Sequence, residues 1–266
     1  MFRKAIVKGQ FYPDCANELT KFFDKIPRSN KKIESSISAI IPHAGYIYSG
    51  KTAFKTLSSI DIPEAAILMG PNHTGMGKRI AVFNDGSWET PFGDITVDKE
   101  LANMLVDEKI IYKDYSAHTN EHCLEVIVPM LKYLNTTVQI VPVVFGLLSY
   151  QECLKIAELI VKSLNEITKK ALIIVSSDMN HYEDSETTTK KDNMAIEAIL
   201  HLDSRKLYET VIEHNITMCG FIPAIIAIEC SKMLGATEGI LIEHTHSGMA
   251  SGFYREVVGY AGIIIK

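Results

Sequence analysis

Three apolar runs in the chain each end in a short turn that carries groups able to bind a metal ion or move a proton. The runs cover residues 37–41, 65–69 and 171–175. The side chains that follow them are His43, His73 and the pair formed by Asp178 and His181. A single histidine after such a run is commonly a loop residue that is satisfied by hydrogen bonds. The same pattern occurs at all three ends, and this repetition favours a shared chemical role.

Short apolar runs bounded by turn residues are typical of buried β-strands. They alternate with helical patterns, which predicts a single α/β domain over residues 1–266, with a largely parallel central sheet flanked by helices. Further strands are predicted at residues 5–7, 80–83, 138–145, 240–243 and 257–264, and helices at residues 151–169, 193–200, 204–213 and 221–233. In α/β sheets, functional groups cluster beyond the carboxyl ends of the strands. We therefore expect the three strand ends to face a common cleft.

Cys219 lies just before the predicted helix at residues 221–233. The dipole at a helix N-terminus favours a thiolate, so we expect the pKa of this thiol to be lowered. The alternative for a lone cysteine is a small buried hydrophobic residue. The position of Cys219 in front of a helix favours the functional interpretation.

His43, His73 and Cys219 would together offer two imidazoles and one thiolate. These donors suit a first-row transition metal and leave coordination positions open for water, oxygen or substrate. His181 then remains free to act as an acid or base, with Asp178 orienting its ring. The alternative for this pair is an aspartate that caps the turn and a solvated histidine. The residues are far apart in the sequence, so only the fold can bring them together.

Two further segments carry polar or aromatic groups that could line the same cleft. Glu121 and His122 lie at the entrance to a predicted helix with an apolar face. Capping of that helix and compensation of its dipole by Glu121 is an equally good interpretation. Trp88 is the only tryptophan and lies in the Gly- and Pro-containing segment 86–94, which we expect to form an ordered loop or an irregular hairpin. It either lines a pocket or covers the core.

The composition narrows the class of protein. Acidic residues number 32 and basic residues 27, giving a net charge of −5 without a long basic run, which argues against nucleic acid as a partner. Charged residues interrupt every apolar stretch before it reaches the length that spans a membrane. The five cysteines are widely spread and form no CxxC pair, which indicates reduced thiols. The N-terminus lacks the apolar core of a signal peptide, so we expect a cytoplasmic protein.

Motifs along nearly the whole chain resemble those of one known family. The segments concerned are Gly9 to Pro13, Pro42 to Tyr46 with Ser49-Gly50, Gly70 to His73, Trp88 to Gly93 with Val97-Asp98, Glu121 to Glu125 with Pro129, Ser176 to Asp178 with His181, Cys219-Gly220 with Pro223, and Val258 to Tyr260. In these motifs the chain resembles the Memo family, which is found with partner genes in the AmmeMemoRadiSam set. The fold of that family is similar to class III extradiol dioxygenases, which hold non-haem iron.

The resemblance implies roles for individual residues. His43, His73 and Cys219 fall on metal-ligand positions, with Cys219 where the dioxygenases carry a glutamate. His181 falls on the position of their acid/base histidine, and Asp178 on a residue of the same cleft. The further residues expected to line this cleft are Tyr46, Asn72, Trp88, Glu121 and His122.

The expected function is that of a metal-dependent enzyme, most simply a redox or oxygen-using one, acting on a small molecule or a peptide. The expected cofactor is iron or copper, with zinc as a third candidate, because a sulfur ligand shifts preference from iron(II) toward copper or zinc. The alternative is a module without catalysis that recognises a (phospho)peptide or partner protein. A third interpretation is an accessory protein linked to a radical-SAM enzyme and an AMMECR-type protein. Neither a nucleic acid nor a membrane is expected as a partner.

Overall fold

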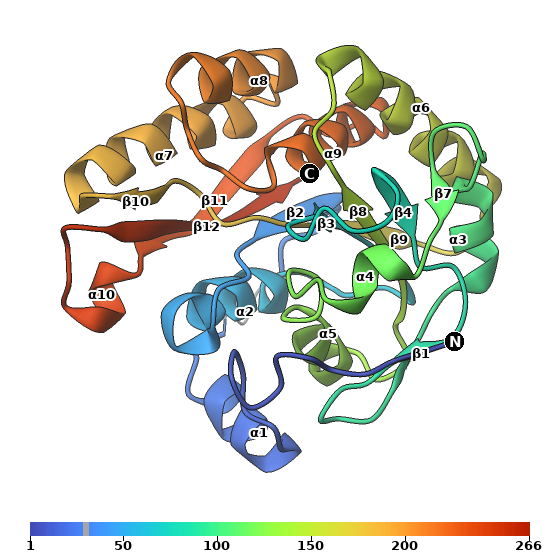
Figure 1. Ribbon diagram of the computed structural model, residues 1–266, viewed down its shortest axis with the longest axis horizontal. Helices are drawn as coiled ribbons and strands as arrows, with labels where there is room; N and C mark the ends of the chain where they lie inside the picture. The colour runs from blue at the N-terminus through green and yellow to red at the C-terminus, as the bar shows by residue number, and fades with distance from the viewer. Residues whose placement is uncertain (29–31) are drawn as a thin grey trace.

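The structure is a computed structural model that describes residues 1–28 and 32–266 (Figure 1). Within these residues, the larger sheet contains nine strands. They are β2 (Ser38–Ile41), β3 (Ala65–Pro71), β4 (Ile80–Val82), β7 (Tyr112–Lys113), β8 (Gln139–Phe145), β9 (Ala171–Ser176), β10 (His181–Glu183), β11 (Gly239–His246) and β12 (Val257–Ile265). Their order is β10-β12-β2-β9-β3-β8-β4-β7, and β11 also pairs with β12.

The middle of this sheet is parallel and its flanks are partly antiparallel. β2, β9, β3 and β8 run parallel to one another, whereas β12 is antiparallel to β2, and β4 to β8. β11 and β12 are joined only by residues 247–256, too short a connection for the crossover that parallel pairing requires, and they form an antiparallel pair. The predicted α/β fold is therefore confirmed, and its parallel part is the centre that carries the three strand ends.

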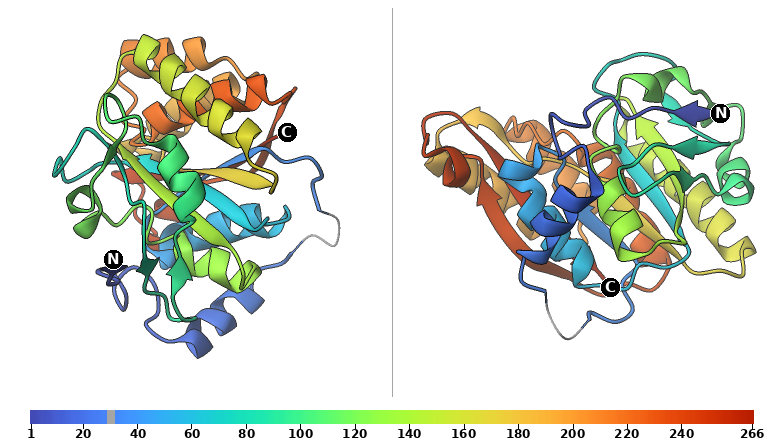
Figure 2. Two further views of the ribbon diagram at one scale, coloured as in Figure 1. Left: turned by 90° about the vertical axis from the view of Figure 1, so that its right-hand side faces the viewer. Right: turned by 90° about the horizontal axis from the view of Figure 1, so that it is seen from below.

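Helices cover both faces of the sheet (Figures 1 and 2). They are α1 (Ala16–Asp24), the π-helix η1 (Tyr46–Gly50), α2 (Lys51–Ser58), α3 (Lys99–Leu105), α4 (Ser116–Thr119), α5 (Val128–Leu134), α6 (Tyr150–Glu166), α7 (Ser185–Leu200), α8 (Ser204–Glu213), α9 (Phe221–Met233) and α10 (Gly248–Ser251). α9 packs on β2, β9 and β3 with α6 and α8 beside it, and α2 packs on β2 and β12. Every residue of β2 and β3 is buried, which explains why these strands are continuous apolar runs.

The N-terminal segment differs from its prediction. Residues 5–7 do not form a strand, and β1 (Phe2–Arg3) instead pairs with β5 (Ser87–Trp88) in a small sheet that also holds β6 (Ile95–Thr96). The backbone amides of Ile6 and Val7 donate to the carboxylate of Glu125. A buried side chain thus satisfies this backbone in place of a neighbouring strand.

Helix α7 begins earlier than the predicted residue 193. The side chain of Asp184 accepts hydrogen bonds from the amides of Glu186 and Thr187, which is an N-cap. This cap accounts for the additional turns.

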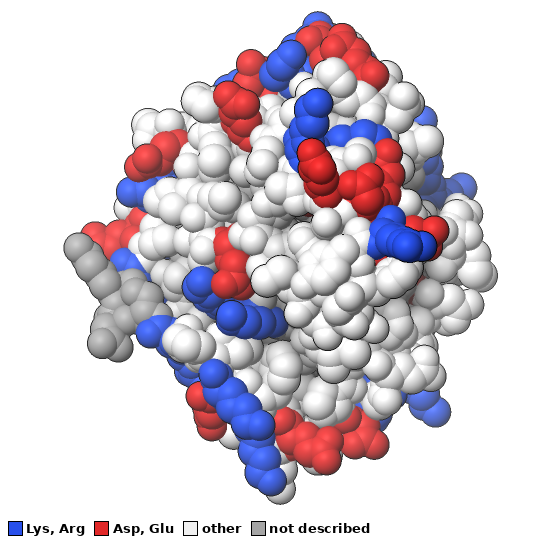
Figure 3. Space-filling view, turned by 90° about the vertical axis from the view of Figure 1, so that its left-hand side faces the viewer, with Lys and Arg blue, Asp and Glu red and all other residues white. Residues whose placement is uncertain are grey.

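No helix in residues 1–28 or 32–266 combines the length and apolarity needed to cross a membrane. On the face seen in Figure 3, acidic and basic side chains are interspersed among uncharged ones.

Candidate metal centre

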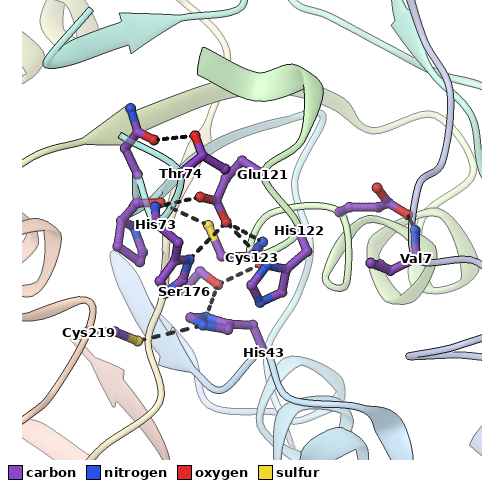
Figure 4. Close-up of polar contacts among 12 residues, drawn as sticks. Val7, His43, His73, Thr74, Glu121, His122, Cys123, Ser176 and Cys219 are labelled. Carbon is purple, nitrogen blue, oxygen red and sulfur yellow. Dashed lines mark hydrogen bonds and ion pairs between the residues drawn. The ribbon is translucent and has the colours of Figure 1, made fainter. Parts of the chain in front are cut away.

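The predicted convergence of strand ends is present at the carboxyl edge of the parallel strands. His43 lies two residues after the end of β2, Asp178 two residues after β9, and His73 two residues after β3. Since β9 lies between β2 and β3, these side chains come from three neighbouring strands. The amide of His43 donates to Oδ1 of Asp178 at 2.8 Å. Cys219 approaches from another direction, just before α9 (Figure 4).

His43 is buried, and its hydrogen bonds determine which ring nitrogen carries the proton. Its Nδ1 lies 2.8 Å from Oγ of Ser176. The Ser176 hydroxyl donates its single hydrogen to the carbonyl of Cys123 at 2.7 Å, so it can only accept from Nδ1–H of His43. The Nε2 lone pair of His43 is therefore free, and it lies 3.6 Å from Sγ of Cys219. Burial, aided by the nearby imidazoles, lowers the pKa of His43 and keeps it neutral, as a metal ligand must be.

Glu121 fixes His73 in the same way. Its Oε1 lies 2.9 Å from Nδ1 of His73 and 3.0 Å from the amide of Cys123, and its Oε2 accepts from the amide of His73 at 2.6 Å. Burial alone would raise the pKa of Glu121, but hydrogen bonds from His73 and from the Cys123 amide lower it to about 2. The ionised carboxylate accepts a hydrogen bond from Nδ1–H, so Nε2 is the nitrogen of His73 that remains for a metal.

Glu121 therefore orients a histidine and does not cap a helix, since α5 begins only at Val128. Asn72 organises the same turn through its side-chain oxygen, which accepts from the Thr74 hydroxyl at 2.9 Å and the Gly75 amide at 3.0 Å.

His122 was expected only to line the cleft, but its ring lies directly against the two predicted histidine ligands. Its ring centroid is 5.1 Å from that of His73 and 5.5 Å from that of His43. One ring nitrogen from each of these three histidines lies within 4.8 Å of the others. Phe11 contacts the ring of His122 edge-on at 5.1 Å between centroids. Apart from the Gly9 to Pro13 motif, nothing along the chain indicated this contact.

Cys219 is half-buried, and its surroundings change the predicted acidity. Burial and the neighbouring carboxylate of Asp178 raise the pKa of the Cys219 thiol, although the Asp178 amide donates to Sγ at 3.3 Å. The predicted lowering by the helix dipole is therefore wrong for the metal-free protein, because desolvation outweighs the dipole. A bound cation is the influence that would convert this thiol to a thiolate.

His181 is oriented by a residue that the sequence did not indicate. Its amide donates to Oγ1 of Thr217 at 2.7 Å, and its Nδ1 lies 2.8 Å from the Thr217 carbonyl, so Nδ1 carries the proton and Nε2 is free. Asp178 was expected to orient this ring, but its carboxylate instead accepts from the amide of His43. Burial raises the pKa of Asp178, and the His43 amide partly offsets the effect. The only signal for Thr217 was its place two residues before Cys219.

Two residues expected in the cleft belong to the core. Tyr46 is buried, and its hydroxyl donates to the carbonyl of Val126 at 2.8 Å. Trp88 is buried between the edge of Phe83 and the guanidinium of Arg3, which lies 4.2 Å from its ring centroid. The large apolar area of each ring explains its burial.

Comparison with known proteins gives matches along nearly the whole chain. The family model described as "Memo-like protein" matches residues 3–264. The chain belongs to this Memo-like family. A "MEMO1 family protein" of Aquifex aeolicus is 42% identical over 266 residues, which cover 98% of each chain. Relatives from Methanobrevibacter smithii and Methanopyrus kandleri are 38% and 36% identical and cover 100% of this chain, with 100% and 99% of their own.

A solved structure supports the fold of this Memo-like chain. It is that of an uncharacterized protein from Escherichia coli K12, with a TM-score of 0.57 and 10% identity. The alignment covers 84% of the present chain and 99% of the other. At this identity the likeness shows the fold alone.

The donors of this Memo-like protein fit a transition metal. Nδ1 of His43 is bound by Ser176 and Nδ1 of His73 by Glu121, which leaves Nε2 of each ring as the candidate donor. The sulfur of Cys219 lies 3.6 Å from Nε2 of His43. Among the described residues, however, it is His122 and not Cys219 that brings a donor atom within 4.8 Å of both histidines. The side chains of His73 and His122 are 32% and 29% exposed, so the group is open to solvent. Imidazole nitrogen and cysteine sulfur donors suit copper, zinc or iron better than magnesium or calcium, which prefer oxygen ligands.

Proposed function

We propose that this Memo-like protein binds a first-row transition metal through His43, His73 and Cys219 and uses it in a redox or oxygen-dependent reaction on a small molecule or peptide. The observation that carries the proposal is the pair of fixed tautomers. Ser176 and Glu121 each hold an Nδ1–H, and this leaves the Nε2 atoms of both histidines as lone-pair donors. Residues that only pack do not need such fixed tautomers, whereas metal-binding histidines characteristically have them.

The metal, when bound, supplies redox or Lewis-acid chemistry. A set of two nitrogens and one sulfur favours copper, with iron and zinc as the other candidates. Proton transfer would then be carried out by residues beside the metal. His181 has its Nδ1–H on the Thr217 carbonyl, so Nε2 is the atom at which it would accept or return a proton.

Metal content tests the ligands. Protein purified anaerobically from its own host is analysed for iron, copper and zinc, and compared with His43→Ala, His73→Ala and Cys219→Ala. His201→Ala, on the exposed end of α7, is the matched control. We expect each ligand variant to lose metal and the control to keep it. Unchanged metal in all three ligand variants would contradict the proposal.

The role of His181 separates catalysis from binding. His181→Ala should keep its metal but lose activity by about a hundredfold or more, the usual effect of removing a general acid or base. Metal-dependent oxygen consumption with catechols and thiols as trial reductants provides the assay. Equal rates for wild type and His181→Ala at matched metal content would instead favour a module that binds a (phospho)peptide or partner protein.

A further inference from the structure

His122 lies against both histidines of the proposed metal site. Its ring is stacked on that of His73, with 19° between the planes, and meets the ring of His43 edge-on at 82°. One nitrogen from each ring lies within 4.8 Å of the other two. A metal ion between His43 and His73 would therefore have a third imidazole beside it.

His122 differs from the other donors in how firmly it is held. His43 is bound by Ser176 and His73 by Glu121 through hydrogen bonds of 2.8 and 2.9 Å. The Nδ1 of His122 lies 3.5 Å from Oε1 of Glu121, beyond the usual hydrogen-bond length. That oxygen already accepts from His73 and from the Cys123 amide. The ring of His122 is thus positioned mainly by stacking on His73 and by Phe11.

Cys219 is also held by the protein. Its Sγ accepts from the amide of Asp178 at 3.3 Å and lies 3.6 Å from Nε2 of His43. The site therefore offers three donors fixed by hydrogen bonds and one imidazole, that of His122, which is held mainly by packing. Four protein ligands close a tetrahedral site, whereas three leave a position for a substrate. A donor that no short hydrogen bond holds in place is the one that can most readily leave the metal.

We propose that His122 is an exchangeable fourth metal ligand, which closes the site when no substrate is present and gives up its position to an incoming donor. This inference rests on the proposed function, because it requires a metal held by His43, His73 and Cys219. It implies that substrates or inhibitors with a small anionic or neutral donor atom bind at the position of His122. Because this side chain is 29% exposed, such a donor can reach that position from solvent.

Cobalt(II) is a suitable probe, because its visible absorption reports coordination number and its near-ultraviolet band reports a bound thiolate. Metal-free wild type, His122→Ala and His122→Gln are titrated with cobalt(II), alongside His43→Ala and the control His201→Ala. We expect His122→Ala to bind cobalt about tenfold more weakly, and His43→Ala more than about a hundredfold more weakly, than wild type. The thiolate band should remain in both His122 variants. Circular dichroism and thermal unfolding establish that each variant is folded, and His122→Gln replaces His122→Ala if the latter is not.

Azide affinity provides a second measurement, and in His122→Ala it should change in the direction opposite to the cobalt affinity. If His122 occupies the fourth position in most molecules, azide must displace it, and the apparent affinity of wild type for azide is reduced by that occupancy. His122→Ala should then bind azide at least about tenfold more tightly than wild type, even though it binds cobalt more weakly. A residue that only packs against His73 would not move the two affinities in opposite directions.

The outcomes separate this inference from the proposed function. Equal cobalt and azide affinities in wild type and His122→Ala, with weak binding in His43→Ala, would overturn the role of His122 and leave the metal site intact. Equal cobalt affinities in wild type and His43→Ala, or no cobalt binding by wild type, would overturn both.

Discussion

Replacing Glu121 with glutamine tests the network that orients His73. The two oxygens of Glu121 accept from three donors, namely the amide and Nδ1–H of His73 and the amide of Cys123. Glutamine has nearly the same shape, but its amide nitrogen would face at least one of these donors. A buried donor without an acceptor costs about 1–3 kcal/mol.

The lowered pKa of Glu121 gives an independent value for the stability that its carboxylate contributes. Its fall from 4.5 to about 2 corresponds to about 3 kcal/mol of stability contributed by the ionised carboxylate. The side chain is only 1% exposed, so screening by solvent does not reduce this value much. Because the pKa is lowered on folding, the contribution is fully present above pH 4.5 and is lost as the pH falls through about 2.

The assay is urea unfolding of metal-free protein at several pH values. We expect Glu121→Gln to be about 3 kcal/mol less stable than wild type at pH 7, and this difference to shrink as the pH falls below 4.5. Glu158→Gln, at an exposed position on α6, is the control and should stay within about 0.5 kcal/mol of wild type. A Glu121→Gln variant as stable as the control, or a stability difference that does not depend on pH, would refute the reasoning.

Three further predictions concern the same site. Ser176→Ala removes the acceptor for Nδ1–H of His43, so metal affinity in a chelator competition should fall by about 10–100-fold; unchanged affinity would count against the fixed tautomer. A Cβ at Gly220 would lie 2.5 Å from the Ser176 carbonyl oxygen, so Gly220→Ala should shift the start of α9, cost about 1–3 kcal/mol in urea unfolding and weaken the cobalt–thiolate band. Cys219 in metal-free protein should be alkylated more slowly than the exposed Cys15, as followed by mass spectrometry, because burial raises its pKa; faster labelling would contradict this.

The sequence by itself predicted the frame of the site. Apolar runs long enough for buried strands fixed the positions of β2, β3 and β9, and the parallel pairing of these strands brought His43, His73 and Asp178 to one edge. The helix predicted at residues 221–233 is observed with these limits, and it places Cys219 near that edge. These features follow from local periodicity and from one rule about parallel sheets, both of which can be read along the chain.

The tertiary structure alone decided which groups touch. The partners of the histidines are Ser176, Glu121 and Thr217, and each pairing depends on a distance between atoms that the sequence does not contain. Tyr46 and Trp88 were likewise expected to line the cleft, but both rings are buried in the core.

The acidity of Cys219 shows the physical reason most clearly. A helix dipole can be predicted from the sequence, because it depends on local backbone order alone. Desolvation depends on every atom that packs around a group, and here it reverses the predicted direction of the pKa change. Local patterns therefore fixed where the candidate ligands lie in the fold, whereas packing between distant segments determined their tautomers, their acidity and the approach of His122 to the site.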